Sequence, residues 1–286
     1  MPARPLRAIQ QIQIGSIASS EARARDVLER LVAYGYEGIE LNGFMTRPSS
    51  LLVRALTRAA GMPVGRAGRL DWAALVPAVG LRVVALHEDL GTIERDPDEV
   101  ARQADRFGTD TIVITGMYRF DYGDEAAVGD LVARLNAAGR TLRERGLRLL
   151  YHNHSVEFRR AHSGRTAMDT IIDGTDPEFV GFELDCFWAA SAGADPLALM
   201  RRLGSRLELC HLTDRGSTRT GSSLTPIDRI DSVELGAGNL DIDGLVAQSA
   251  TAGARAVVVE THRNWIDGSP LRSAEVSAEA LNRLLV

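Results

Sequence analysis

Four short apolar runs of the sequence each end in a side chain of a type that binds metal ions. The four residues are His152, Asp185, His211 and Glu260. Such runs are typical of buried strands, and the strands of a parallel barrel present their C-terminal ends on one face. Imidazole and carboxylate ligands together suit Mn2+, Co2+, Zn2+, Fe2+ or, less well, Mg2+. The pattern therefore predicts a site for one divalent metal ion, among which we place Mn2+ first.

The chemistry that such an ion supports is proton transfer next to a carbonyl group. An ion that chelates vicinal oxygens of a polyol or ketose stabilises an enediolate, so a nearby base can remove the proton alpha to the carbonyl. Glu260 is a candidate for both metal ligand and base. His152 and His154 are the other catalytic candidates, because residues two apart in a strand lie on the same side. We predict no further cofactor-binding residues.

Five further residues near the strand ends are candidates for substrate contacts. They are Glu157, Trp188, His87, Glu40 and Asp214. Trp188 is suited to pack on the C–H face of a sugar ring, although ordinary packing at the rim explains it equally well. Glu157 lies in a loop from which it could reach a substrate hydroxyl. The alternative is that it is an exposed loop glutamate without a role in the site. Glu183 precedes Asp185 by two positions, so we expect it to face the same interior and to support the site rather than bind the metal.

These strand ends belong to a regular alternation of β-rich apolar runs and amphipathic stretches, which is the pattern of βα units. Eight strands are expected, at residues 9–17, 38–41, 81–86, 109–115, 147–152, 180–185, 207–212 and 254–260. Helices are expected at residues 19–34, 71–79, 96–105, 124–145, 163–172, 195–203, 241–252 and 273–285. The number of units alone also fits a doubly wound sheet. The polar residues at the strand ends favour a single (β/α)8 TIM barrel that spans residues 1–286.

Two segments depart from the regular alternation. An insertion at about residues 43–70 follows the second strand and contains an expected extra helix at residues 49–60. The loop after the seventh strand, at about residues 214–233, is rich in Gly, Ser and Thr, and we expect it to be mobile. Both segments are candidates for substrate lids or for the contacts of a homodimer.

Composition argues against several classes of function. All 33 basic residues are arginine, so no lysine is available for a Schiff base, a phosphate-binding P-loop or general base catalysis. The net charge of -5 argues against nucleic acids and anionic membranes as partners. No apolar stretch reaches the roughly 18 residues of a membrane span, and the N-terminus lacks a hydrophobic signal core. We therefore expect a cytoplasmic protein whose partner is a small-molecule sugar or polyol.

Six motifs together carry a family resemblance. They are residues 36–41 (YEGIEL), 151–154 (YHNH) with Glu157, 182–188 (FELDCFW), 211–214 (HLTD), 234–238 (ELGAG) and Glu260. With these motifs the chain resembles the sugar phosphate isomerase/epimerase superfamily of xylose isomerase-like TIM barrels. The resemblance implies a divalent metal held by residues of strands five to eight, here His152, Asp185, His211 and Glu260. The register of the strand-five ligand among Tyr151, His152 and His154 stays open.

The sequence departs from the superfamily pattern at two positions, and a third position separates it from a related class of nucleases. Sugar epimerases of the superfamily usually carry Glu at the strand-five position, where this chain has His152; the histidine-rich strand is similar to the inosose dehydratase and keto-sugar lyase branch. Thr213 stands where a lysine is common, which favours substrates without phosphate. Endonuclease IV-like enzymes need a second histidine where this chain has Trp188, so a nuclease is not expected.

The expected function is that of a divalent-metal-dependent sugar isomerase or epimerase. Its substrate would be a non-phosphorylated sugar, keto-sugar or cyclitol. The first alternative is a dehydratase or lyase that eliminates water or cleaves a keto-glycoside by beta-elimination. An alternative of another class is a non-catalytic carbohydrate-binding barrel.

Overall fold

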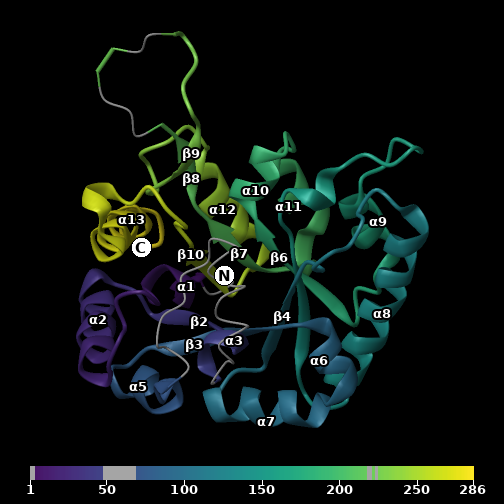
Figure 1. Ribbon diagram of the computed structural model, residues 1–286, viewed down its shortest axis with the longest axis horizontal. Coiled ribbons are helices and arrows are strands. Elements are labelled where there is room, and N and C mark those ends of the chain that lie inside the picture. The colour runs from purple at the N-terminus through teal and green to yellow at the C-terminus, as the bar shows by residue number, and fades with distance from the viewer. Residues whose placement is uncertain (1–3, 48–68, 218–220, 223–224) are drawn as a thin grey trace.

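Eight parallel strands close into a barrel in the computed structural model, which describes residues 4–47, 69–217, 221–222 and 225–286 (Figure 1). In pairing order the strands are β1 (Leu6–Gln10), β10 (Ala256–Val259), β7 (Leu207–Leu212), β6 (Val180–Asp185), β5 (Arg148–His152), β4 (Thr111–Thr115), β3 (Arg82–Glu88) and β2 (Gly38–Asn42). The TIM barrel predicted from the sequence is confirmed.

Helices connect the strands and cover the outside of the barrel (Figure 1). The longer ones are α2 (Glu21–Tyr34), α5 (Trp72–Ala78), α6 (Leu90–Arg95), α7 (Pro97–Phe107), α8 (Glu125–Arg143), α9 (Ala167–Gly174), α10 (Cys186–Ser191), α11 (Pro196–Leu203), α12 (Ile242–Ala252) and α13 (Pro270–Leu284). Most begin at a Ser, Thr or Asp side chain that accepts a backbone N–H of the first turn, which is the chemistry of an N-cap. Among the described residues, no helix combines the length and hydropathy that a bilayer crossing needs.

The interior of the barrel changes from apolar to polar along the strands. A buried apolar cluster fills its lower part and consists of Ala8, Ala85, Val113, Leu150, Leu209, Ala256 and Val258. Residues two positions further along a strand point to the same side, and in this chain they are polar: Gln10, His87, Thr115, His152, His211 and Glu260. Glu40 and Glu183 follow Gly38 and Gly181 with the same spacing. The strands therefore carry a layer of ionisable side chains directly above the apolar layer.

The strand predicted at residues 9–17 is wrong. The barrel strand β1 begins earlier, because Leu6 pairs with Ala256, and the short helix α1 (Gln11–Ile14) follows it. The alternating sequence QIQI has the periodicity of a strand, but Gln10 Oε1 accepts the N–H of Ile12 at 3.0 Å and starts the helix. The helix predicted at residues 163–172 begins later, at Ala167, because Thr166 forms a capping box with Asp169.

The loop after β7 contains a short antiparallel pair that the sequence did not predict. Strand β8 (Asp214–Gly216) pairs with β9 (Asp231–Val233). Residues 218–220 and 223–224 lie outside the described residues, and the mobility expected for this loop stays a prediction. The expected insertion at about residues 43–70 begins with the short helix α3 (Gly43–Thr46). The helix expected at residues 49–60 lies outside the described residues.

Two glycines of α8 give a test of how this helix packs beside the strands that carry the polar layer. A Cβ at Gly139 would overlap the carbonyl oxygen of Phe179, just before β6, whereas a Cβ at Gly129 would meet nothing within 4 Å. We expect Gly129→Ala to stabilise the fold by up to about 1 kcal/mol through helix propensity. Gly139→Ala should destabilise it by about 1–3 kcal/mol through overpacking. Urea unfolding of both variants measures this, and shifts of the same sign would contradict the packing described.

Candidate metal centre and active-site cavity

The structure brings the four predicted metal ligands together. His152, Asp185, His211 and Glu260, here called the metal quartet, are all buried, and one ligand atom of each lies within 4.8 Å of the others. His211 Nδ1 is 2.8 Å from Glu260 Oε2 and 4.0 Å from Asp185 Oδ2. His152 Nε2 is also 4.0 Å from Asp185 Oδ2. Two imidazole nitrogens and two carboxylates at this spacing are a donor set that fits a divalent cation.

Buried carboxylates fix the orientation of both histidines. His152 Nδ1 donates to Glu183 Oε2 at 2.9 Å, and His211 Nε2 donates to Glu40 Oε2 at 2.7 Å. The nitrogens that face the quartet are therefore Nε2 of His152 and Nδ1 of His211. A carboxylate on the far nitrogen of a ligating histidine sets the tautomer and the direction of the ring. This geometry agrees with the supporting position expected for Glu183.

Asp185 is held at the end of β6 by its own backbone and by the helix that follows. Asn153 Oδ1 accepts the N–H of Asp185 at 3.0 Å, and Asn153 Nδ2 donates to the Asp185 carbonyl oxygen at 3.2 Å. Asp185 Oδ1 accepts the N–H of Trp188 at 2.8 Å and so caps α10. The second oxygen, Oδ2, remains directed at the two histidines of the quartet.

The quartet concentrates negative charge in a buried space. Burial, together with the nearby Glu260 carboxylate, raises the pKa of Asp185 to about 7. Burial also lowers the pKa of His211, but the carboxylates of Glu183, Glu40 and Glu260 outweigh it and leave that pKa well above the usual value. The pKa of Glu260 is lowered because His262 and His211 outweigh its burial. Protons on Asp185 and His211 thus neutralise part of the negative charge that a bound cation would neutralise.

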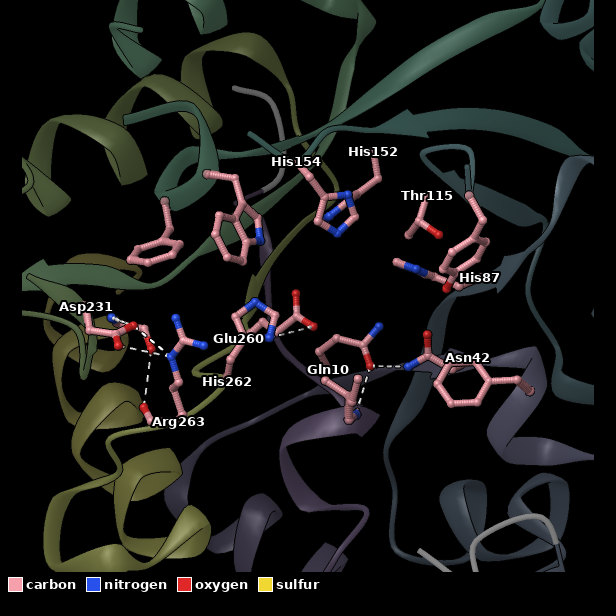
Figure 2. Close-up of a pocket in the computed structure, with 16 residues that line it drawn as sticks. Gln10, Asn42, His87, Thr115, His152, His154, Asp231, Glu260, His262 and Arg263 are labelled. Carbon is pink, nitrogen blue, oxygen red and sulfur yellow. Dashed lines mark hydrogen bonds and ion pairs between the residues drawn. The ribbon is translucent and has the colours of Figure 1, made fainter. Parts of the chain in front are cut away.

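A cavity of about 370 Å³ opens above the quartet and is lined by both polar and aromatic side chains (Figure 2). Four of the predicted catalytic or contact residues line it together with Glu260: His87, His152, His154 and Trp188. The rings of His154 and Trp188 are 6.1 Å apart between centroids. Burial lowers the pKa of His154 to about 3, so this imidazole is neutral near pH 7. Phe44, Phe187 and Tyr118 add an aromatic wall, and Tyr118 is 77% exposed.

Three predicted substrate contacts lie outside the lining of this cavity. Glu40 is fully buried and contacts His211 of the quartet. Glu157 is also fully buried; it accepts the hydroxyl of Tyr151 at 3.0 Å and the backbone N–H of His154 at 2.9 Å. Asp214 accepts four backbone N–H groups at 2.7–3.0 Å, from Arg215, Gly236, Gly238 and Leu240. Glu157 and Asp214 thus hold loops beside the cavity, and the substrate contacts of all three residues stay predictions.

The cavity also contains residues to which sequence reasoning gave no role. His262 follows Glu260 by two positions, as His154 follows His152, and this shared spacing is a signal that could have identified it. Gln10 Oε1 accepts from Asn42 Nδ2 at 2.7 Å, and both residues line the cavity. The strand misplaced at residues 9–17 concealed the position of Gln10. The ion pair between Arg263 and Asp231 carries no sequence signal, because Asp231 reaches the cavity through the unpredicted strand β9.

With the barrel and site described, the sequence can be placed in a family. Residues 28–284 match the profile of the family described as xylose isomerase-like TIM barrel. The chain belongs to this family.

Three known proteins illustrate what this chain is similar to. An inosose dehydratase from Mesomycoplasma hyopneumoniae is 33% identical over 85 residues, which are 30% of this chain and 27% of that protein. The chain therefore aligns with only about a quarter of the length of this relative. A sugar phosphate isomerase/epimerase structure from Parabacteroides distasonis has a TM-score of 0.72 at 20% identity and covers 98% of this chain and 94% of its own. The structure of the IolI protein with a zinc atom has a TM-score of 0.65 at 14% identity and covers 98% of both chains.

Asp185→Asn provides a test of the quartet with opposite expected effects in the absence and presence of metal. A carboxyl with a raised folded-state pKa favours folding below its unfolded pKa of about 4 and loses that contribution as the pH rises through about 7. We therefore expect the metal-free variant at pH 8 to unfold about 2 °C or more above the wild type, with a smaller difference near pH 4. Mn2+ should raise the melting temperature of the wild type by clearly more than that of the variant.

The matched control is Asp130→Asn, an exposed aspartate on α8. Its melting temperature should equal that of the wild type at both pH values, and Mn2+ should raise it as in the wild type. A variant at position 185 that keeps the full Mn2+ response would remove Asp185 from the metal centre. Melting followed by circular dichroism provides all of these values.

Proposed function

We propose that the protein is a divalent-metal-dependent isomerase or epimerase. It acts on a non-phosphorylated sugar, keto-sugar or cyclitol by removing the proton alpha to a carbonyl group. The observation that carries the proposal is the convergence of the metal quartet beneath a cavity that also contains His154. Membership of the family and the zinc atom in the IolI structure support a metal-dependent reaction. A bound divalent ion would draw electron density from the substrate carbonyl and so acidify the neighbouring C–H.

Two groups of the chain are placed to transfer protons on different sides of the substrate. His154 lies beyond the end of β5 and Glu260 follows β10, and these strands are separated in the barrel by β6 and β7. The neutral His154 imidazole can accept a proton, and so can the ionised Glu260 carboxylate. Abstraction by one group and return by the other changes the configuration at the carbon or moves the carbonyl. Trp188 closes the cavity beside His154 and limits the access of water.

The lining of the cavity favours a substrate without phosphate. Arg263 is the one arginine among the described residues that line it, and its guanidinium is 2.9 Å from Asp231 Oδ1. The chain has no lysine to take its place. Apart from the carboxylates of Asp231 and Glu260, the remaining polar lining consists of amides, hydroxyls and imidazoles, including Gln10, Asn42 and Thr115. These groups hydrogen-bond neutral hydroxyls well and provide little charge for a phosphate.

The second candidate is elimination from the same kind of keto substrate, and a specific observation favours it. His152 occupies the strand-five position, where its Nδ1 is engaged by Glu183, so it offers one nitrogen for the metal and none for proton transfer. One sequence relative with a named activity is an inosose dehydratase. In this reaction one group removes the alpha proton and the other protonates the departing hydroxyl or glycosyl oxygen.

Glu260→Gln and His154→Gln test the proton-transfer roles. General acid–base groups contribute about 10²–10⁴-fold to rate, so each variant should lose at least about 10²-fold in kcat. Glu178→Gln, an exposed position, serves as the control and should keep wild-type kcat. Full activity of Glu260→Gln would remove this carboxylate from the mechanism.

Incubation of a keto-inositol or keto-sugar in D2O distinguishes the two candidate reactions. Isomerisation or epimerisation retains the composition of the substrate and incorporates solvent deuterium at the alpha carbon, which mass spectrometry detects. Elimination lowers the substrate mass by one water or by the glycosyl group. Saturable binding without deuterium uptake or mass change, across a panel of such substrates, would contradict both and support a carbohydrate-binding barrel.

A further inference from the structure

A second group of possible metal ligands lies beside the quartet in the interior of the barrel. Glu40 of β2, His87 of β3, Glu183 of β6 and His211 of β7, here called the inner group, offer ligand atoms that lie within 4.8 Å of one another. All four are buried, and both glutamates have no exposed surface. The inner group shares His211 with the quartet, and its other three residues do not belong to the quartet.

The spacing of the inner group is that of ligands around a single ion. His87 Nε2 is 2.9 Å from Glu40 Oε2 and 3.2 Å from Glu183 Oε2. His211 Nε2 is 2.7 Å from Glu40 Oε2 and 3.2 Å from Glu183 Oε1. Ligands at about 2.1 Å from an ion stand about 3.0 Å apart when they meet it at right angles. The observed separations lie close to this value.

Hydrogen bonds do not account for all the polar atoms of the inner group. Among the residues that the structure describes, three of its buried atoms find no hydrogen-bond partner of acceptable geometry: Glu40 Oε1, Glu183 Oε1 and His87 Nε2. The two contacts of His87 Nε2 are therefore short without being aligned as hydrogen bonds. A buried polar atom without a partner costs about 1–3 kcal/mol. Three such atoms in one place indicate a ligand.

Charge balance leads to the same conclusion. Four carboxylates are buried in the interior of the barrel: Glu40, Glu183, Asp185 and Glu260. Within the described residues, the ion pairs of all four involve only histidines, and the chain has no lysine. One divalent ion in the quartet offsets two of the four negative charges. The carboxylates of Glu40 and Glu183 would remain, and in the absence of a second ion their charge is balanced by protons on the paired imidazoles of His87 and His211.

We propose that the inner group binds a second divalent cation of the kind that takes mixed nitrogen and oxygen ligands, such as Mn2+, Co2+ or Zn2+. His211 then stands between two ions, with Nδ1 directed at the quartet and Nε2 at the inner group. Binding replaces the proton that Nε2 donates to Glu40, and this proton leaves to solvent. The ion has a route of entry, because His87 lines the cavity together with Gln10 and Asn42. The proposal concerns binding alone and goes beyond the proposed function.

The test is the number of Mn2+ ions bound per chain. Metal-free full-length protein is dialysed to equilibrium against increasing Mn2+, and bound metal is counted by mass spectrometry of the digested protein. We expect two ions in the wild type and in the Glu178→Gln control, and one ion in Glu40→Gln and in His87→Gln. Asp185→Asn should also bind one ion. Electron paramagnetic resonance should show a spin-coupled Mn2+ pair in the wild type and isolated Mn2+ in all three site variants.

A wild-type count of one ion overturns the proposal, whatever the variants do. If that ion is lost in Asp185→Asn and retained in Glu40→Gln, the inner group is a hydrogen-bonded support and the proposed function stands. A wild-type count of zero contradicts the metal dependence of the proposed function as well. Two ions that both survive Glu40→Gln and His87→Gln, in protein shown to be folded by circular dichroism, also overturn the inner site.

Discussion

Burying several carboxylates next to one another is the constraint on which the rest of this site depends. Charged carboxylates in an interior of low polarity are costly unless a cation or a hydrogen bond compensates them. In this barrel Glu40, Glu183, Asp185 and Glu260 are compensated by imidazoles, and Asp185 has a raised pKa of about 7 because compensation is incomplete. A site of this kind is poised to exchange protons for a divalent cation.

The barrel supports this group of carboxylates on an apolar layer directly beneath it. Ala8, Ala85, Leu150, Leu209 and Val258 fill the lower interior, and the polar residues follow two positions later on the same strands. Since every strand runs in the same direction, one layer of each type results. His152 and Asp185 are supported from neighbouring strands, and His211 is supported by Glu40 of β2, which is not adjacent to β7. Hydrogen bonds therefore hold all three side chains before any ligand arrives.

Much of the fold and the convergence of the four candidate ligands could be predicted because both follow from simple periodicities. Apolar runs with a polar residue at the C-terminal end predicted His152, Asp185, His211 and Glu260 as neighbours. The sequence could not show which polar residues would be engaged elsewhere. Backbone N–H groups engage both oxygens of Asp214, and the Tyr151 hydroxyl and the His154 N–H engage those of Glu157. The substrate contacts of both residues stay predictions. The strand prediction for the QIQI segment was wrong for a similar reason, since the Gln10 side chain caps a short helix there despite the alternating pattern.

The central claim is that four side chains from four strands hold one divalent ion at the base of the cavity. Crystals soaked in Mn2+ and measured at wavelengths on both sides of the manganese absorption edge test it most directly. The account predicts an anomalous peak about 2.0–2.3 Å from His152 Nε2, Asp185 Oδ2, His211 Nδ1 and a carboxylate oxygen of Glu260. An anomalous map of fully soaked crystals without a peak between these four residues would contradict it.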